Sequence, residues 1–362
     1  MIFASEFFSD DYFQARDKFY LASKRINVDV FSFECPAKGP RGETLTVDAT
    51  WVGPKDAQRV ILSVSGIHGV EGFCGSGCQV SWLSSLKENA LPENTAALII
   101  HMINPFGAAW QCVETHENID LNRNFVDFSK TLPVNILYSK LHLALTCPDR
   151  TGSKKEKAKQ AQEDFIKENG FDNFVQAVAG GQYQYKNGFN FGGQQASWSN
   201  DVLQKIVQEY IPKTSKVAVI DYHTGLGEYG ESMIISNQNP NSIAGKRLQS
   251  WFGDICFSQS GDVGYEPTGG FAESVSTFLP NAQVAAIVLE YGTYPIERIA
   301  NAMFNSFWLT QFGDYSTKLA KDIQKETTKS FYPNEVLWHN KVINRSKQIL
   351  DMTLAGFEED IC

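Results

Sequence analysis

Runs of apolar residues divide this chain into a series of buried strands. Four runs have the length and composition of strands buried on both faces, and they cover residues 59–65, 95–103, 217–222 and 284–289. A helical pattern that begins near Phe73 and continues from Cys78 to Leu86 separates the first run from the second. A strand, a helix and a further strand in this order form a βαβ unit, in which the two strands are parallel neighbours. The pattern therefore predicts an α/β fold with a sheet that is parallel at its centre.

Alternating and helical patterns precede this central region. Aromatic residues at helical spacing predict a helix over residues 10–24. Residues 28–35 and 44–53 then alternate between apolar and polar positions, which is typical of two antiparallel strands joined by a turn over 36–43. We therefore expect the chain to enter the sheet through a hairpin, so that the sheet as a whole is mixed.

The second half of the chain is predicted to be richer in helices. Residues 133–210 are mostly helical in pattern, and 295–312 and 336–355 have the pattern of helices that close the chain. A loop at 180–195 is rich in glycine, amide and aromatic residues. It is either a rim that faces a substrate or a surface loop that packs its own tyrosines, and the sequence favours neither. Because no internal repeat and no linker is visible, we expect one domain over residues 1–362.

The composition is that of a folded, acidic protein. Of the 362 residues, 43% are hydrophobic and 20% are charged, and the net charge is −9. Nucleic acid is an unfavourable partner for such a chain, because phosphate binding requires a basic surface. The basic cluster at 154–159 is interrupted by Glu156 and Ala158 and has the pattern of an exposed helix face. No apolar run is long enough to cross a membrane, so we expect no membrane partner.

The N-terminal residues and the cysteines both favour a cytoplasmic location. Glu6, Asp10 and Asp11 make the first residues acidic, and no basic segment precedes a long apolar stretch as it does in a secretory signal. The seven cysteines are scattered and odd in number, which fits reduced thiols better than a disulfide framework. Cys74 and Cys78 lack a second pair at zinc-knuckle spacing, so we expect them to be small core residues of a helix.

Candidate chemistry is concentrated just after the first buried strand. His68 and Glu71 lie three residues apart in SVSGIHGVEGFCGSG, residues 63–77, where glycines allow the backbone to turn sharply. Ligands of open α/β sheets bind where parallel strands end, and an imidazole and a carboxylate on one turn can converge on a zinc ion. A loop histidine beside a surface glutamate has the same local sequence. The residues that follow favour the interpretation of this pair as two zinc ligands.

The third and fourth buried runs end in residues of the same chemical kind, because they lead directly into His223 and Glu290. A parallel sheet gathers such strand ends along one edge, which makes His223 a third ligand beside His68 and Glu71. This set leaves a position open for water, and Glu290 is the expected base for that water. Asp221 shares a strand face with His223 and is expected to orient its imidazole. Taken singly, each of these residues also fits a structural role.

A further motif, ENIDLNRNF at residues 117–125, offers groups for a substrate. Arg123 carries a planar guanidinium suited to a carboxylate, and Asn122 is an additional donor. Asp120 is able to hold a metal-binding histidine in place. A buried salt bridge explains Arg123 equally well when the motif is considered alone.

The order of these motifs resembles the zinc carboxypeptidase family of metallopeptidases. The motifs H-x-x-E, NP-F-G, DLNRNF, D-x-HTG and LEYGT follow one another within residues 58–295, and the most specific among them are HGVEG and DLNRNF. The branch that shares these two motifs is cytosolic and uncharacterised, and it also resembles aspartoacylase and succinylglutamate desuccinylase. The resemblance implies a mixed, centrally parallel sheet sandwiched by helices, with C-terminal helices at about 295–355.

The resemblance also implies a role for each residue already named. It assigns zinc binding to His68, Glu71 and His223, general base and acid catalysis to Glu290, carboxylate binding to Asn122 and Arg123, and support of His68 to Asp120. One zinc ion per chain is the expected cofactor, and the sequence leaves a second metal open.

Two departures from the family pattern affect the substrate side of the site. Relatives usually carry a further arginine upstream of DLNRNF, but this chain has none between Asn104 and Arg123, where Gln111 and His116 are the nearest polar residues. The substrate-side tyrosine of the family has no clear match either. Tyr265, in GYEPTGG, is the candidate for that role.

Together the motifs predict a zinc-dependent hydrolase that cleaves an amide bond next to a free carboxylate, most simply a metallocarboxypeptidase acting on short peptides. An N-acyl amino acid deacylase that uses the same metal and Glu290 is the alternative among hydrolases. A metal-binding protein without turnover is the alternative outside them, and the presence of Glu290 beside all three ligands counts against it. A serine hydrolase is excluded, because the chain contains no G-x-S-x-G motif. The side-chain preference and the oligomeric state stay open.

Overall fold

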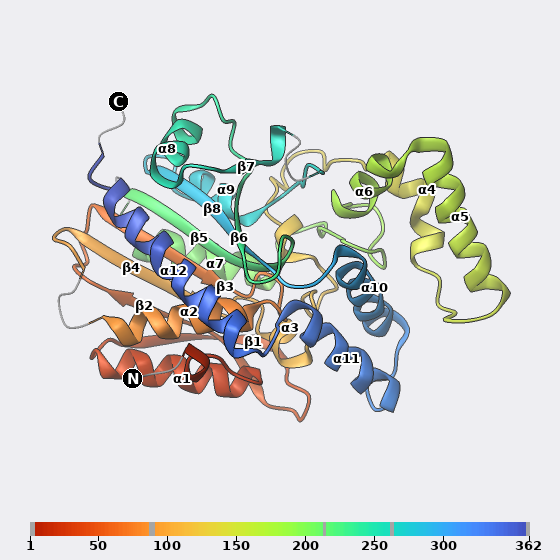
Figure 1. The fold of residues 1–362 in the computed structure, drawn as a ribbon, viewed down its shortest axis with the longest axis horizontal. Coiled ribbons are helices and arrows are strands. Elements are labelled where there is room, and N and C mark those ends of the chain that lie inside the picture. Colours follow the sequence, from red (N-terminus) through yellow and green to blue (C-terminus); the bar gives the residue numbers. More distant parts are fainter. Residues whose placement is uncertain (1–3, 87–90, 213–214, 261–263, 360–362) are drawn as a thin grey trace.

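A single mixed sheet forms the centre of the computed structural model, which describes residues 4–86, 91–212, 215–260 and 264–359. The sheet has 8 strands in the order β1-β2-β4-β3-β5-β8-β6-β7 (Figure 1). The strands are β1 (Val30–Lys38), β2 (Thr44–Val52), β3 (Arg59–Ser65), β4 (Thr95–His101), β5 (Lys216–Gly225), β6 (Ser232–Ser236), β7 (Cys256–Phe257) and β8 (Gln283–Gly292).

The strands at the centre of the sheet are parallel, and antiparallel pairs flank them. β3 lies between β4 and β5 and is parallel to both, and β5 is also parallel to β8. The hairpin β1–β2 pairs antiparallel with β4 on one side, while β6 pairs antiparallel with β8 on the other. These pairings confirm the mixed, centrally parallel sheet that the sequence predicts.

β3 shows why the central strands have continuous apolar runs. Ile61 belongs to the core on one face of the sheet, whereas its neighbours Val60 and Leu62 belong to the core on the other face. All of them have a relative exposure of 0%. A strand that is covered on both faces needs apolar residues at every position, because successive side chains point to opposite faces.

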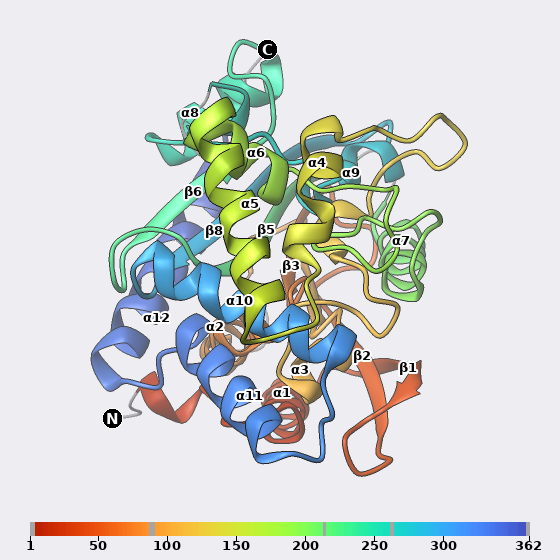
Figure 2. The same cartoon turned by 90° about the vertical axis from the view of Figure 1, so that its right-hand side faces the viewer.

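Helices cover both faces of the sheet and extend past one end of it. They are α1 (Tyr12–Arg25), α2 (Gly72–Ser85), α3 (Pro105–Trp110), α4 (Ile136–Leu145), α5 (Ser153–Asn169), α6 (Phe171–Ala179), α7 (Trp198–Tyr210), α8 (Ile243–Phe252), α9 (Phe271–Phe278), α10 (Ile296–Phe312), α11 (Lys318–Phe331) and α12 (Val336–Gly356), with short 3-10 turns η1 (Ala4–Glu6), η2 (Leu121–Arg123) and η3 (Ser258–Ser260). Side chains of α1, α2, α8 and α12 share one core with the sheet, and those of α7 and α9 share the other. Figures 1 and 2 show α4, α5 and α6 grouped beside the sheet, near α10, and not on either face.

The observed elements match most of the predicted ones and differ at their ends. β4 stops at His101 and not at 103, since Met102 has a φ of 54° that a strand cannot contain. β5 and β8 continue past the predicted ends, so that His223 and Glu290 lie within the strands. The sequence patterns did not indicate the helices α3, α8, α9 and α11, nor the short strands β6 and β7, which form one end of the sheet.

The cysteines and the basic cluster at 154–159 can also be compared with the sequence predictions. Cys74 and Cys78 are buried in α2, and the described part of the chain contains no disulfide, while Cys362 lies outside it. The basic cluster at 154–159 falls on α5, whose residues there are exposed except for Ala158. None of the helices in the described ranges has the length and hydropathy that crossing a membrane requires.

Candidate functional site

The turn that follows β3 places His68 and Glu71 at the carboxyl end of the parallel strands. Gly66 begins this turn with a φ of 78°, a left-handed conformation that glycine adopts without strain. Glu71 then occupies the N-cap position of α2. Strand β3 and helix α2 therefore fix both ends of a short segment that carries the two side chains.

Gly69 is required for a different reason, which is the close approach of two backbone segments. A Cβ atom at this position would lie 2.1 Å from the carbonyl carbon of Gly107, far inside van der Waals contact. The Gly69 N–H donates to the carbonyl of Val113 over 3.2 Å, so the turn rests against the segment that follows β4. The HGVEG and NP-F-G motifs thus meet through their glycines.

This contact leads to a prediction for Gly69→Ala. The added methyl group meets backbone and not a flexible side chain, so the turn must move and carry His68 and Glu71 out of place. We expect a lower melting temperature together with weaker metal binding, measured by thermal unfolding and elemental analysis. Gly152→Ala is the control, because its Cβ would have open space and only its backbone conformation, with a φ of 83° and a ψ of −174°, opposes it, at a cost of about 1–3 kcal/mol. Equal behaviour of the two variants would contradict the argument.

His223 and Glu290 reach the same edge of the sheet from neighbouring strands. They are direct partners in the parallel register of β5 and β8. Glu290 is held by the N–H of Leu226, which donates to its Oε1 atom over 2.9 Å. Both side chains are almost fully buried, with relative exposures of 3% for His223 and 7% for Glu290.

The carboxylate of Glu71 lies between the two imidazoles. Its Oε1 atom is 2.8 Å from Nδ1 of His68, and its Oε2 atom is 3.1 Å from Nδ1 of His223. The N–H of Thr224 also donates to Oε2 over 2.8 Å. One ligand atom from each of His68, Glu71 and His223 lies within 4.8 Å of the other two, which is compatible with a shared metal ion.

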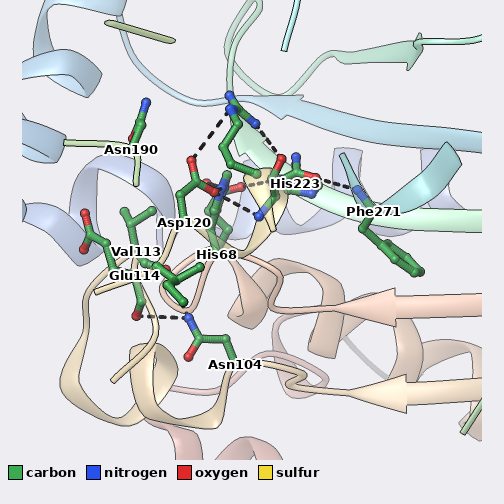
Figure 3. A network of polar contacts seen from close by, with 12 residues as sticks. His68, Asn104, Val113, Glu114, Asp120, Asn190, His223 and Phe271 are labelled. Atoms are coloured by element: carbon green, nitrogen blue, oxygen red, sulfur yellow. Dashed lines mark hydrogen bonds and ion pairs between the residues drawn. The ribbon is translucent and has the colours of Figure 1, made fainter. Parts of the chain in front are cut away.

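A second carboxylate supports each imidazole from behind. Oδ1 of Asp120 is 3.0 Å from Nε2 of His68 (Figure 3), and Oδ2 of Asp221 is 2.9 Å from Nε2 of His223. Each ring thus points its Nδ1 atom toward the carboxylate of Glu71 and is held in place through its Nε2 atom. Metal-binding histidines are typically held in this way, with the far nitrogen donating to a carboxylate or carbonyl.

The charges in this cluster shift one another's pKa values. Burial favours the neutral imidazole of His68, but the nearby carboxylates of Glu71 and Asp120 outweigh it and raise its pKa to about 9. Burial opposes ionisation of Glu71, but the two histidines lower its pKa to about 2. Glu290 differs from both, because burial and the negative charge of Glu71 raise its pKa to about 7. The negative charges of the cluster thus favour a bound cation, and among the carboxyls of Glu71, Asp120 and Glu290, that of Glu290 accepts a proton most easily.

Arg123 is buried with its guanidinium fixed by carbonyl groups. Its Nη2 and Nε atoms donate to the carbonyl of Ala179 over 2.7 and 3.2 Å, and Nη1 donates to the carbonyl of Asn122 over 2.8 Å. Asp120 is more distant, at 4.0 Å from Nε. Burial and Asp120 act on the pKa of Arg123 in opposite directions, and the net effect is a raised pKa. Neutral carbonyl groups therefore position the guanidinium, and Asp120 is the carboxylate beside it.

A cavity of about 400 Å³ contains all of these groups. The three candidate ligands, Glu290, Asn122 and Arg123 line it, and so does Tyr265, whose ring centroid is 6.0 Å from the guanidinium carbon of Arg123. The remaining wall is largely apolar and comes from α6 and α10, with Phe174, Val175, Val178, Ile299, Met303 and Phe304 among its residues. The structure thus brings the predicted site residues together in one recess, with Asp221 directly behind it.

Gln111 and His116 lie outside the lining of this cavity. Gln111 ends α3 with a φ of 57°, and the ring of His116 packs against that of Phe106 at 6.0 Å. Neither residue takes the place of the missing upstream arginine. Within the lining, Arg123 is the one arginine, and no lysine accompanies it.

The loop at 180–195 borders the cavity and also packs its tyrosines against neighbouring segments. Phe189 and Asn190 line the cavity, whereas the hydroxyl of Tyr183 donates to the carbonyl of Arg123 over 2.7 Å. The ring of Tyr185 stacks on His142 of α4 with a centroid distance of 3.9 Å. The aromatic composition of the loop indicated that it could border a cavity. The sequence did not indicate that the Ala179 carbonyl holds Arg123 or that α6 and α10 form the apolar wall.

The chain matches one protein family and is similar to solved structures of carboxypeptidases. A family model described as "Protein of unknown function (DUF2817)" matches residues 8–345. No curated protein matches the sequence. The structure is similar to carboxypeptidase A from Helicoverpa armigera, with a TM-score of 0.44, 14% identity, and coverage of 90% of this chain and 74% of that one. It is also similar to a metallo-carboxypeptidase from Pseudomonas aeruginosa, with a TM-score of 0.39, 9% identity, and coverage of 90% and 68%.

Proposed function

This chain belongs to the DUF2817 family of proteins of unknown function, and we propose that it is a zinc-dependent hydrolase that cleaves an amide bond next to a free carboxylate. The simplest such enzyme is a carboxypeptidase acting on short peptides. The observation that supports this proposal most is the joint position of His68, Glu71 and His223 in a cavity that also contains Arg123 and Glu290.

The donor set fits zinc on its own chemistry. Two imidazoles and one carboxylate are the protein ligands of many catalytic zinc sites, which leave one position open. The structure adds that both imidazoles present Nδ1 to Glu71 and are fixed at Nε2 by carboxylates. His68, Glu71 and His223 would hold the ion, which when bound supplies a Lewis acid and lowers the pKa of a bound water toward about 7.

The remaining residues position the substrate and move the proton. Arg123 holds the free carboxylate of the substrate, because its guanidinium is buried and fixed by carbonyl groups that do not neutralise it. Asn122 adds a donor through its amide nitrogen, since its Oδ1 atom already accepts the N–H of Phe271 over 3.0 Å. Glu290 takes a proton from the attacking water and delivers it to the leaving amine.

The test is a substrate screen with the purified protein in the presence and absence of zinc. Short peptides and N-acyl amino acids, each with a free carboxylate, should be compared at equal concentration. Zinc-dependent release of a C-terminal amino acid from peptides supports the carboxypeptidase proposal. Cleavage confined to N-acyl amino acids would replace it with the deacylase, and zinc binding without any hydrolysis would leave a metal-binding protein.

Metal content gives an independent prediction. We expect one zinc ion per chain in elemental analysis, and we expect His68→Ala and His223→Ala to lose it. A ligand present at 1,000 times its Kd stabilises the folded state by about 4 kcal/mol, so a chelator should lower the melting temperature of the wild-type protein. His116→Ala is the control, because that histidine lies outside the cavity. Unchanged zinc in either ligand variant would refute the assignment.

A further inference from the structure

Glu273 is a carboxylate in the cavity that the proposed chemistry does not use. It lies in the first turn of α9 and lines the same recess as the candidate metal ligands. Its side chain keeps some solvent exposure, although it lies deep in the protein, because it borders the cavity. A carboxylate at such a position can contact a molecule that enters the cavity.

The position of Glu273 within the cavity is defined by its neighbours. The N–H of Asn237 donates to Oε1 of Glu273 over 2.9 Å. A Cβ atom built on Gly270 would lie 3.0 Å from Oε2 of Glu273 and 3.7 Å from Oδ1 of Asn122. The side chains of Glu273 and Asn122 therefore both lie close to the space that a Cβ atom of Gly270 would occupy. This places Glu273 on the side of the cavity where Asn122 and Arg123 would hold the substrate carboxylate.

Glu273 also differs from the other carboxylates of the cavity in its charge environment. Glu71 contacts two imidazoles, and Asp120 lies beside His68 and Arg123. Within the described ranges, no lysine, arginine or histidine forms an ion pair with Glu273, and the charged group that affects its pKa is the negative Asp221, which raises it. Burial is the main cause that raises its pKa. A buried carboxylate without a cation is unfavourable, and an incoming cation removes that cost.

We propose that Glu273 selects substrates whose carboxyl-terminal residue has a basic side chain, lysine or arginine. The proposal rests on the proposed function, because it takes the carboxylate of that residue to lie at Arg123. Ile235 and Val288 are cross-strand neighbours that also line the cavity. They offer an apolar surface for the methylene stem of such a side chain, while Glu273 receives its charged end.

The competing explanation is that Glu273 serves the helix alone. A glutamate in the first turn of a helix stabilises the helix N-terminus through its negative charge. In that case its removal lowers stability and affects all substrates alike. Glu273→Gln separates the two explanations, because the amide oxygen still accepts the N–H of Asn237 while the charge is lost.

The experiment compares zinc-loaded wild type and Glu273→Gln on two peptides. The peptides are N-benzoylglycyl-lysine and N-benzoylglycyl-norleucine, which differ in the terminal ammonium group of the side chain. We expect the wild type to favour lysine by at least about tenfold in kcat/KM, since tenfold corresponds to about 1.4 kcal/mol. The ratio should fall toward one in Glu273→Gln. Glu266→Gln, which removes an exposed carboxylate of a nearby segment, should keep the wild-type ratio.

A binding measurement distinguishes failure of this proposal from failure of the proposed function. Free lysine and free norleucine are titrated calorimetrically into both proteins, which requires no turnover. Selective binding of lysine that depends on Glu273 supports the selectivity even when no peptide is hydrolysed. Hydrolysis with equal rates for both peptides in the wild type overturns the selectivity and leaves the hydrolase intact. Absence of both hydrolysis and selective binding overturns the two proposals together.

Discussion

Glu290→Gln is expected to abolish most hydrolysis while leaving the fold and the bound zinc in place. The carboxyl of Glu290 is not among the candidate ligands, so its loss should not release the metal. The glutamine oxygen still accepts the N–H of Leu226, the contact that orients the side chain in β8. What the amide cannot do is accept a proton. A general base typically accelerates a reaction by about 10² to 10⁴-fold, so kcat should fall by a factor within this range or larger.

The measurement needs three readouts on the same preparation, namely kcat, zinc content and melting temperature. Glu231→Gln is the matched control, because that carboxylate is exposed and pairs with Lys341 at a distance from the cavity. It should keep wild-type activity. If Glu290→Gln retained most of its hydrolysis, the base would have to be another group, and Glu273 would be the next carboxylate to test. Loss of zinc from Glu290→Gln would instead show that it belongs to the metal site.

The fold could be predicted to a large extent because its central strands are buried on both faces. A strand such as β3 must be apolar at every position, and this requirement is visible in the sequence without any knowledge of its neighbours. The short strands β6 and β7 at one end of the sheet carry no such requirement, since pairing with their neighbours and not their own pattern makes them strands. The end of β4 was predicted too late for a similar reason, because the φ of Met102 has no local sequence cause.

The candidate site was predictable where function depends on side chains at strand ends. His68, His223 and Glu290 could be named because each follows or ends an apolar run, and parallel strands gather their ends. The groups that fix Arg123 could not be named, since they are the backbone carbonyls of Ala179 and Asn122. Any residue type supplies a carbonyl, so the sequence contains no trace of it. The role proposed for Glu273 could not be predicted either, because it depends on which charged side chains lie near Glu273 in the described part of the folded chain.

Arg123→Ala is expected to remove the preference for substrates with a free carboxylate. Hydrogen bonds to a charged group contribute about 1.5–3 kcal/mol each. Blocking the carboxylate of a peptide as an amide should therefore reduce kcat/KM of the wild type by at least about tenfold. In Arg123→Ala the free acid should lose most of its activity, while the blocked peptide changes little. Arg123→Lys should restore the preference only in part, because an ammonium lacks the planar fork of a guanidinium.

Stability alone does not distinguish this role from that of a structural arginine. Arg123 satisfies the carbonyl of Ala179 and lies 4.0 Å from Asp120, so its removal leaves buried polar groups without a partner. We therefore expect a lower melting temperature under either hypothesis. Arg247→Ala is the matched control, because Arg247 is also buried, at 9% exposure, but does not line the cavity. It should lose stability without changing the ratio between free and blocked substrates.

The ratio between the two substrates decides the question, because both are measured on the same folded protein. A structural arginine that holds α6 and η2 together would, when removed, distort the cavity for any substrate. Equal losses on the free and the blocked peptide would follow, and they would remove the carboxylate-binding role of Arg123. The site would then be that of a zinc amidase without a carboxylate anchor. A selective loss on the free acid has no such structural explanation, since the two peptides differ only at the group that the guanidinium is expected to bind.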